Sequence, residues 1–352
     1  MALSTDLGAP RLWPARAPAP LEVEEVVTLR GLEQLQGEWR WLWTRCPQAT
    51  TFQRPEWLLP WYRHFGPYFS PRPPWVVTLR SEGRLVGLAP LVIREEDGVR
   101  VVRLLGEGIS DYLDVLMDPE LAPRGVRALF DWLVRNGEHW DACVFEQLRE
   151  DSPLLRTPAP PGWAEHAEEQ EVCPQTVLPW AAGGRLASNL RQARRRLERL
   201  GPVRFEEANT DNLDAMMDTL IHLHGASWRR RGEPGVLEDA SLQSFHREVA
   251  RGLLAARSLC LYALRVDERP VAAFYGFRDG SHVRYYLGGF DPEFERYSVG
   301  SLVVAHALEE AARTGATVFD FLRGPEPYKY LWGAKDTRNH RRSLWHGPET
   351  KM

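Results

Sequence analysis

The stretch "CLYALRVDERPVAAFYGFRDGSHVRYYLGGF" (residues 260–290) decides the fold of this chain. It holds three runs rich in β-branched and aromatic residues, at 260–266, 269–277 and 282–290. A short polar turn follows each of the first two runs, and the second turn contains Asp-Gly. Runs of this composition joined by such turns predict an antiparallel meander of three strands.

A second meander of the same kind stands in the first half of the sequence. Its three runs are "WVVTLR" (75–80), "RLVGLAPLVI" (84–93) and "VRVVRLLGEG" (99–108), and Asp-Gly again marks the second turn. Self-similarity of this kind is the signature of a repeated unit. The sequence therefore predicts two copies of one structural unit.

The segments around each meander correspond as well. Two helical patterns precede each meander, at 32–45 and 55–65 in the first copy and at 212–230 and 241–256 in the second. After each meander comes a helical pattern with a glycine at its end. A strand closes each copy, at 140–150 and at 316–324. Each half reads β-αα-βββ-α-β, which predicts a mixed α/β (α+β) fold in two tandem copies.

The length of the chain agrees with two domains, because 352 residues exceed one ordinary hydrophobic core. We expect a loose arm rich in Ala and Pro at 1–20, a first domain at 21–180 and a second at 181–352. Between the copies, "EDSPLLRTPAPPGW" (150–163) has the prolines of a linker. The run "VCPQTVLPW" (172–180) predicts an added strand.

Composition excludes several classes of function. The net charge of −4 gives no bulk attraction to nucleic acid or anionic lipid. The four cysteines are scattered without a CxxC pair, which argues against a disulfide framework and a structural zinc site. No run of eighteen apolar residues occurs, and the N-terminus lacks the apolar core of a secretion signal. We expect a cytoplasmic protein with no metal and no membrane insertion.

The order of elements resembles the GCN5-related N-acetyltransferase (GNAT) fold, and more closely the double-GNAT family typified by CelD-like cellulose-biosynthesis proteins. Four motifs carry the resemblance, which covers roughly residues 52–334: "TFQRPEWLLPWYRHFG" (51–66), "RLVGLAPL" (84–91), "LLGEGISDYLDVL" (104–116) and "FDFLRGPEPYKYLWGA" (319–334). It implies two tandem acyl-CoA N-acyltransferase domains. The implied reaction moves an acyl group, acetyl by preference, from acyl-CoA to an amine or hydroxyl of a small molecule or saccharide.

In the GNAT fold, the loop before the helix that follows the meander presents backbone N–H groups to the coenzyme A pyrophosphate. A helix N-terminus suits this role because its free amides and dipole favour an anion. In the second copy the matching run begins at Arg296 and includes Gly300, which fit the pattern, whereas Val299 and Ser301 depart from it. An ordinary helix start capped by Ser298 is the alternative.

The first copy differs at the same place. Pro123 stands in its turn and has no N–H to give, and nothing there matches Arg296. We therefore predict that only the second copy binds the coenzyme. The predicted coenzyme-binding residues are Leu287, Gly288, Gly289 and Phe290 on the fourth strand, together with Arg296, Ser298, Val299, Gly300 and Ser301.

The glycines of this strand have two interpretations. A bulge at Gly288-Gly289 would aim free N–H groups at the thioester carbonyl. Alternatively, the two glycines begin a turn.

The GNAT resemblance also implies that the fourth and fifth strands part, so that the pantetheine arm enters between them. Residues after the fifth strand would then lie beside the sulfur. On this basis Tyr328 would protonate the departing thiolate, Lys329 would hold an anionic group, and Asp320 or Glu326 would act as the base. Two alternatives stay open: Asp320 is a structural partner of Arg323 or Lys329, and Tyr328 only packs.

The first copy supplies candidates for acceptor binding. Asp111, Tyr112 and Asp114 cluster where its fourth strand should end, and they would suit a cationic or polyhydroxyl acceptor. A solvated turn is the alternative.

Two other functions remain open at the level of sequence. A Fem-type transferase would take an aminoacyl group from tRNA and would use the basic face of the helix at 188–200, although nucleic acid is not the expected partner. A non-catalytic double-GNAT module in polysaccharide or surface assembly would have no activity.

Overall fold

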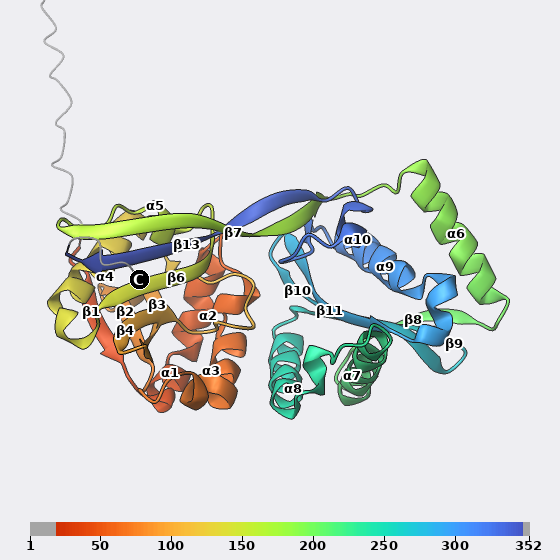
Figure 1. The fold of residues 1–352 in the computed structure, drawn as a ribbon, viewed down its shortest axis with the longest axis horizontal. Coiled ribbons are helices and arrows are strands. Elements are labelled where there is room, and N and C mark those ends of the chain that lie inside the picture. Colours follow the sequence, from red (N-terminus) through yellow and green to blue (C-terminus); the bar gives the residue numbers. More distant parts are fainter. Residues whose placement is uncertain (1–18, 348–352) are drawn as a thin grey trace, which may run out of the picture.

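The computed structural model describes residues 19–347, so the arm predicted at 1–20 lies almost wholly outside the described residues. The described chain forms one mixed sheet that runs through both halves, with helices on its two faces (Figure 1). This agrees with the mixed α/β fold predicted from the sequence. No helix within residues 19–347 has the length and apolar character needed to cross a membrane.

The first half contains the predicted meander. Its strands are β1 (Glu22–Val26), β2 (Trp75–Ser81), β3 (Arg84–Glu96), β4 (Val99–Leu104), β5 (Leu116–Met117) and β6 (Ala142–Arg149). Its helices are α1 (Leu29–Gln34), α2 (Gln36–Arg45), α3 (Pro55–Phe69), α4 (Ala122–Arg135) and α5 (Pro153–Arg156), with 3₁₀ turns η1 (Thr51–Gln53) and η2 (Gly137–His139). Strands β1, β2, β3 and β4 pair antiparallel in that order, and β6 is parallel to β4.

The second half repeats this order. Its strands are β8 (Val203–Glu207), β9 (Leu259–Val266), β10 (Arg269–Asp279), β11 (His282–Phe290) and β12 (Val318–Asp320). Its helices are α6 (Gly184–Glu198), α7 (Leu213–Arg229), α8 (Ala240–Ala255), α9 (Val299–Arg313) and α10 (Pro327–Tyr330), with η3 (Val236–Glu238) and η4 (Pro292–Tyr297). Strand β12 is shorter than the predicted 316–324, because the chain leaves the sheet after Asp320 and Leu322 has a φ of 58°.

Two tight hairpins explain the shape of the first meander. Their central residues are Glu82-Gly83 and Asp97-Gly98, and all four have positive φ. Two-residue hairpin turns need this backbone because it matches the twist of the flanking strands. The turn residues seen in the sequence thus set the pairing of β2, β3 and β4.

Two long strands join the halves. Strand β7 (Trp163–Val177) pairs with β12 at its end and with β13 (Lys335–His346) along most of its length. Strand β13 lies between β6 and β7, so the last strand of the predicted second domain (181–352) pairs with a strand of the first half. Figure 1 shows β7 and β13 running together from one half to the other.

One face of the sheet carries a core that both halves share. Helices α1, α2 and α3 of the first half and α7 and α8 of the second bury their apolar side chains in a single cluster. On the opposite face α4 and α9 pack in separate clusters, one for each half. The shared cluster and the two joining strands hold the halves together.

Candidate functional site

The second half contains a cavity where two parallel strands part. Strands β11 and β12 pair only at His282–Arg284 and Val318–Asp320. Beyond this pairing a cavity of about 530 Å³ opens between the end of β11 and residues 321–332. The GNAT resemblance implied such a separation of the fourth and fifth strands.

The cavity reaches elements on both faces of the sheet. Gly300, Ser301 and Val304 of α9 line it on one face, while His224 and Trp228 of α7 line it on the other. The cores under these helices are separate clusters. A molecule in the gap can therefore contact groups on both faces of the sheet.

The N-terminus of α9 presents free amides to this cavity. In the described chain, the amides of Val299, Gly300 and Ser301 donate no hydrogen bond, and Ser298 provides no side-chain cap. A methyl group placed on Gly300 would meet nothing closer than Phe290 Cδ1 at 3.7 Å. Free amides, the helix dipole and open space together favour an anion here.

The same place in the first half is closed. The amide of Gly125 donates to the carbonyl of Leu121 at 2.6 Å, and a methyl on Gly125 would lie 2.8 Å from the sulfur of Met117. The amide of Leu113 donates to the carbonyl of Gln147 on β6 at 3.0 Å. Residues after β4 thus occupy the space that stays open in the second half.

Three of the predicted coenzyme residues, Arg296, Ser298 and Val299, do not line the cavity. Leu287, Gly288, Gly289, Phe290, Gly300 and Ser301 all line the cavity. Arg296 is not among the lining residues, and its guanidinium lies over the Tyr297 ring at 4.9 Å. Ser298 has the left-handed backbone (φ 54°) that starts α9.

The bulge in β11 lies before the two glycines. The register against β10 shifts so that Tyr286 is the extra residue. Gly289 instead allows α7 to approach, because a methyl there would lie 2.3 Å from the backbone nitrogen of His224. Gly289 therefore serves helix packing, and the ring of Tyr286 packs against Trp57 of α3 and His246 of α8.

His224 is a cavity residue that was not among the candidates predicted from the sequence. Its Nδ1 lies 2.9 Å from the carbonyl oxygen of Gly288, which can only accept, so Nδ1 carries the hydrogen and Nε2 the lone pair. Burial lowers the pKa of His224, which favours the neutral ring. In residues 19–347 no group of His, Cys, Asp and Glu side chains is placed to hold a metal ion.

Tyr328 lines the cavity and leaves its hydroxyl available. Its ring packs edge-on against Phe321 and Tyr285, with centroids 6.4 and 6.5 Å away. Within the described residues the hydroxyl makes no hydrogen bond to protein. Burial raises the pKa of Tyr328, so the phenol keeps its proton at neutral pH and can donate it.

Lys329 has a different role from the one predicted. Its buried Nζ donates to the carbonyls of Leu322, Arg323 and Gly324 at 3.1, 2.6 and 3.0 Å. It also lies 2.9 Å from the Glu326 carboxylate, the candidate base, which is half exposed. An ammonium has three hydrogens, so these partners use its whole donor capacity. Lys329 thus fixes the loop that forms one wall of the cavity.

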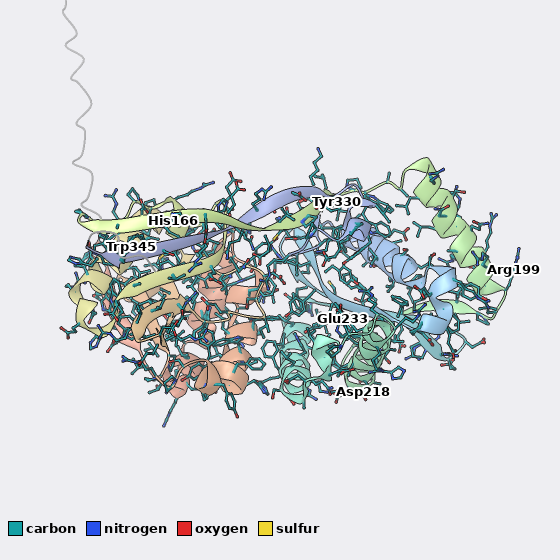
Figure 2. The ribbon with its side chains drawn as sticks, in the orientation of Figure 1. His166, Arg199, Asp218, Glu233, Tyr330 and Trp345 are labelled. Atoms are coloured by element: carbon teal, nitrogen blue, oxygen red, sulfur yellow. The ribbon has the colours of Figure 1, made fainter. Side chains whose placement is uncertain are left out.

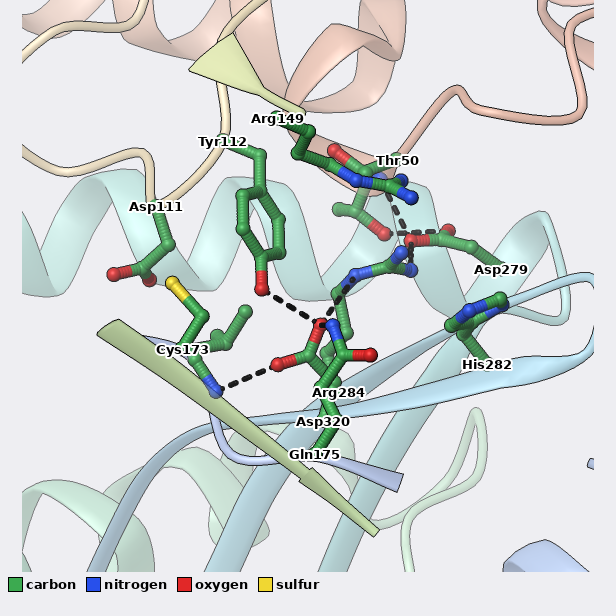
Figure 3. Close-up of polar contacts among 12 residues, drawn as sticks. Thr50, Asp111, Tyr112, Arg149, Cys173, Gln175, Asp279, His282, Arg284 and Asp320 are labelled. Carbon is green, nitrogen blue, oxygen red and sulfur yellow. Dashed lines mark hydrogen bonds and ion pairs between the residues drawn. The ribbon is translucent and has the colours of Figure 1, made fainter. Parts of the chain in front are cut away.

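Asp320 lies outside the cavity, in a buried network between the halves (Figure 3). It accepts hydrogen bonds from Tyr112 Oη at 2.9 Å and Gln175 Nε2 at 3.1 Å. Arg284 lies 3.7 Å from Asp320 and 2.5 Å from Asp279. Asp320 therefore takes the structural alternative, with Arg284 rather than Arg323 or Lys329 as its ionic partner.

The three acceptor candidates of the first half separate in space. Asp111 lines the cavity, and its Oδ1 is 2.6 Å from Arg323 Nε. Burial raises the pKa of Asp111, while the charge of Arg323 acts in the opposite direction. Tyr112 belongs to the buried network with Asp320. Asp114 is absent from the cavity lining, and burial raises its pKa to about 7.

Residues 184–330 match the family model described as an acetyltransferase (GNAT) domain. The chain has a tandem GNAT-like fold. The family match lies in the second half, and the first half repeats the same order of elements. None of the curated proteins matches the chain. The finer CelD-like resemblance stays a prediction.

Solved structures share this tandem GNAT-like fold over most of their length. FemX superposes with a TM-score of 0.64 at 12% identity, covering 91% of this chain and 96% of that one. The C-terminal DUF2156 domain of a putative lysylphosphatidylglycerol synthetase from Agrobacterium fabrum gives 0.58 at 13% identity, with 89% and 92% covered. A conserved protein of unknown function from Bacteroides thetaiotaomicron gives 0.51 at 10% identity, with 93% and 99% covered. At such identities the likeness concerns the fold.

Proposed function

We propose that the protein is an N-acyltransferase that moves an acyl group, acetyl by preference, from acyl-CoA to an amine of a small molecule or saccharide. The observation that carries the proposal is the free N-terminus of α9, whose amides open into the cavity between the parted strands. The GNAT match over residues 184–330 supports the same reaction class.

In this proposal the free amides at the start of α9, of which those of Gly300 and Ser301 belong to residues that line the cavity, bind the coenzyme pyrophosphate. The pantetheine arm then lies between β11 and residues 321–332, which brings the thioester toward the middle of the gap. Strand β11 pairs with β12 only at residues 282–284, so the later backbone amides of β11 that point toward the gap are available to stabilise the oxyanion.

Asp111 is the proposed base and the anchor of the acceptor amine. It replaces Asp320, which does not line the cavity, and Glu326, whose side chain is half exposed whereas that of Asp111 is mostly buried. A raised pKa brings a carboxylate closer to the working pH of a base. Asp111 takes a proton from the acceptor ammonium, and the neutral amine attacks the thioester carbonyl. The carbon–sulfur bond breaks, Tyr328 protonates the thiolate, and the proton that the nitrogen loses on becoming an amide returns to the Tyr328 oxygen. A hydroxyl acceptor would follow the same path.

The decisive experiment mixes the purified protein with acetyl-CoA and a panel of amines, and measures both free thiol and acetylated product by mass spectrometry. The proposal predicts thiol release that depends on the amine and stabilisation of the fold by acetyl-CoA alone. Absence of both effects would refute it. Stabilisation without product, for every amine and alcohol in the panel, would favour the non-catalytic module.

A second candidate is a Fem-like transfer of an aminoacyl group from tRNA. Helix α6 favours it, because Arg191, Arg195 and Arg199 have no carboxylate within 4.0 Å among the described residues. Figure 2 shows Arg199 at the outer end of this helix. This candidate predicts a tRNA complex whose affinity falls steeply with salt. An affinity that does not depend on salt would remove the support from α6.

A further inference from the structure

Three consecutive arginines follow one another at the end of α7, and they have different surroundings. Arg229 pairs with Glu238 at 3.0 Å, and Arg230 lies 3.8 Å from Glu295. Arg231 lines the cavity, and within residues 19–347 it has no carboxylate within 4.0 Å. Nothing in the run "WRRRG" (228–232) distinguishes the third arginine from the first two, so its position at the cavity could not be predicted from the sequence.

The side chain of Arg231 is held over an aromatic ring at the cavity. Its guanidinium carbon lies 5.3 Å from the centroid of Trp228, which also lines the cavity. Stacking on an aromatic face orients a guanidinium while leaving its N–H groups free to bind an anion. This geometry is that of a binding residue, whereas Arg229 and Arg230 stabilise the helix end.

The charge of Arg231 acts inside the cavity. Burial is the main influence on the pKa values of His224, Tyr285 and Tyr328, and the positive charge of Arg231 acts to lower all three. The other cavity cations are already paired, Arg323 with Asp111 and Lys329 with Glu326. Arg231 is thus the cation left in the lining of this cavity to meet the charge of a ligand.

We propose that Arg231 binds an anionic group of the acceptor, a carboxylate or a phosphate. The inference rests on the proposed function, and it specifies the acceptor as an amine that also carries an anion, such as an amino acid or an amino-sugar phosphate. Arg231 follows α7 on one face of the sheet, whereas the amides proposed for the coenzyme pyrophosphate belong to α9 on the other. Asp111 then receives the amine and Arg231 the anion.

The test compares Arg231→Gln with the matched variant Arg230→Gln, which removes the neighbouring charge outside the cavity. Each variant is assayed with paired acceptors that differ only in the anion: an amino acid and its amide, and an amino-sugar phosphate and the free amino sugar. For the better anionic acceptor, Arg231→Gln should lower kcat/KM about 10–150-fold, the range expected for a lost hydrogen bond to a charged group, and mostly through KM. For the neutral acceptor of each pair, Arg231→Gln should change kcat/KM less than about twofold. Arg230→Gln should change kcat/KM less than about twofold for all acceptors.

The coenzyme is the other possible source of the anion, and the same variants separate the two. A rise in the KM for acetyl-CoA in Arg231→Gln, with acceptor kinetics unchanged, would assign Arg231 to a coenzyme phosphate and overturn the proposal. Equal losses for anionic and neutral acceptors would also overturn it.

A binding measurement tests the inference without turnover. Inorganic phosphate, titrated by calorimetry in the presence of saturating coenzyme A, should bind the wild type and Arg230→Gln but not Arg231→Gln. Equal binding by all three proteins would refute an anion site at Arg231, whatever the reaction. If phosphate binding depends on Arg231 but no amine releases thiol, the proposed function fails and the anion site stands.

Discussion

Replacing Gly300 with proline tests the coenzyme site most directly. The substitution removes one backbone N–H that faces the cavity and donates to no group in residues 19–347. The cost to the fold should be small, because α4 already carries Pro123 at the equivalent second position of its helix. Any loss of coenzyme binding can then be ascribed to the amide.

The size of the effect follows from linkage. At a coenzyme concentration one hundred times Kd, a ligand selective for the native state stabilises it by about 2.7 kcal/mol. A hydrogen bond from the Gly300 amide to a charged phosphate oxygen contributes about 1.5–3 kcal/mol. Without it, the stabilisation by acetyl-CoA at the same concentration should fall to about 0.3–1.3 kcal/mol. The assay is isothermal denaturation of wild type and variant with and without acetyl-CoA.

Gly300→Ala is the matched control, because it keeps the amide and adds a methyl that meets only Phe290 at 3.7 Å. We expect it to retain most of the stabilisation by acetyl-CoA. If Gly300→Pro binds acetyl-CoA as tightly as the wild type does, the α9 amides do not hold the coenzyme and the assignment is wrong. If both variants lose binding, the affinity for acetyl-CoA depends on the close approach of the ligand to the Gly300 backbone rather than on the Gly300 amide.

Three further predictions concern single side chains. Tyr328→Phe should lower kcat about 10²–10⁴-fold and leave the melting temperature unchanged, because the hydroxyl has no protein partner in the described chain; unchanged thiol release would show that the ring only packs. Lys329→Met should lower the free energy of unfolding by about 3–5 kcal/mol, since three carbonyls and Glu326 lose their donor. Chemical denaturation measures this change. A stable variant in which only the KM for the acceptor rises would instead support the predicted anion-binding role of Lys329. Burial raises the pKa of Glu107 from 4.5 to about 8. Between these pH values the native state holds a proton that the unfolded chain releases. The free energy of unfolding should therefore fall as the pH rises from 4.5 to 8, by up to about 4 kcal/mol. Glu107→Gln should abolish that slope in denaturation curves from pH 5 to 8.5, and an unchanged slope would assign it to other groups.

The order of elements could be predicted because each element depends on local chemistry. The turn at Asp97-Gly98 needs two residues with positive φ, and the sequence supplies residues that tolerate it. The position of β13 could not be predicted in this way. Its sequence, "KDTRNHRRSLWH" (335–346), gives no sign that it pairs with β6 and β7, because such pairing depends on residues about 160–200 positions away. Long-range register leaves no local pattern.

The site residues show the same limit. Asp111 and Asp114 are three residues apart in one loop, yet Asp111 lines the cavity and Asp114 does not. A loop has no periodicity from which side-chain direction follows, so the sequence could not separate them. Asp320 ends a strand beside the cavity, and its ionic partner, Arg284, lies on the neighbouring strand. The sequence indicated a polar cluster at the strand end but not which member faces the ligand.

One segment explains why the two copies have different roles. Residues 105–117 follow β4, and in the first half they occupy the space that would otherwise be a cleft, with Leu113 bonded to β6. The same segment carries Asp111 to Arg323 and Tyr112 to Asp320 in the second half. The same segment therefore fills the cleft of the first half and supplies side chains to the second half. A single copy could not supply Asp111 to its own cavity in this way, since the segment that carries Asp111 fills the cleft of its own half. The acceptor site proposed here accordingly requires both copies, whereas the coenzyme site requires only the second.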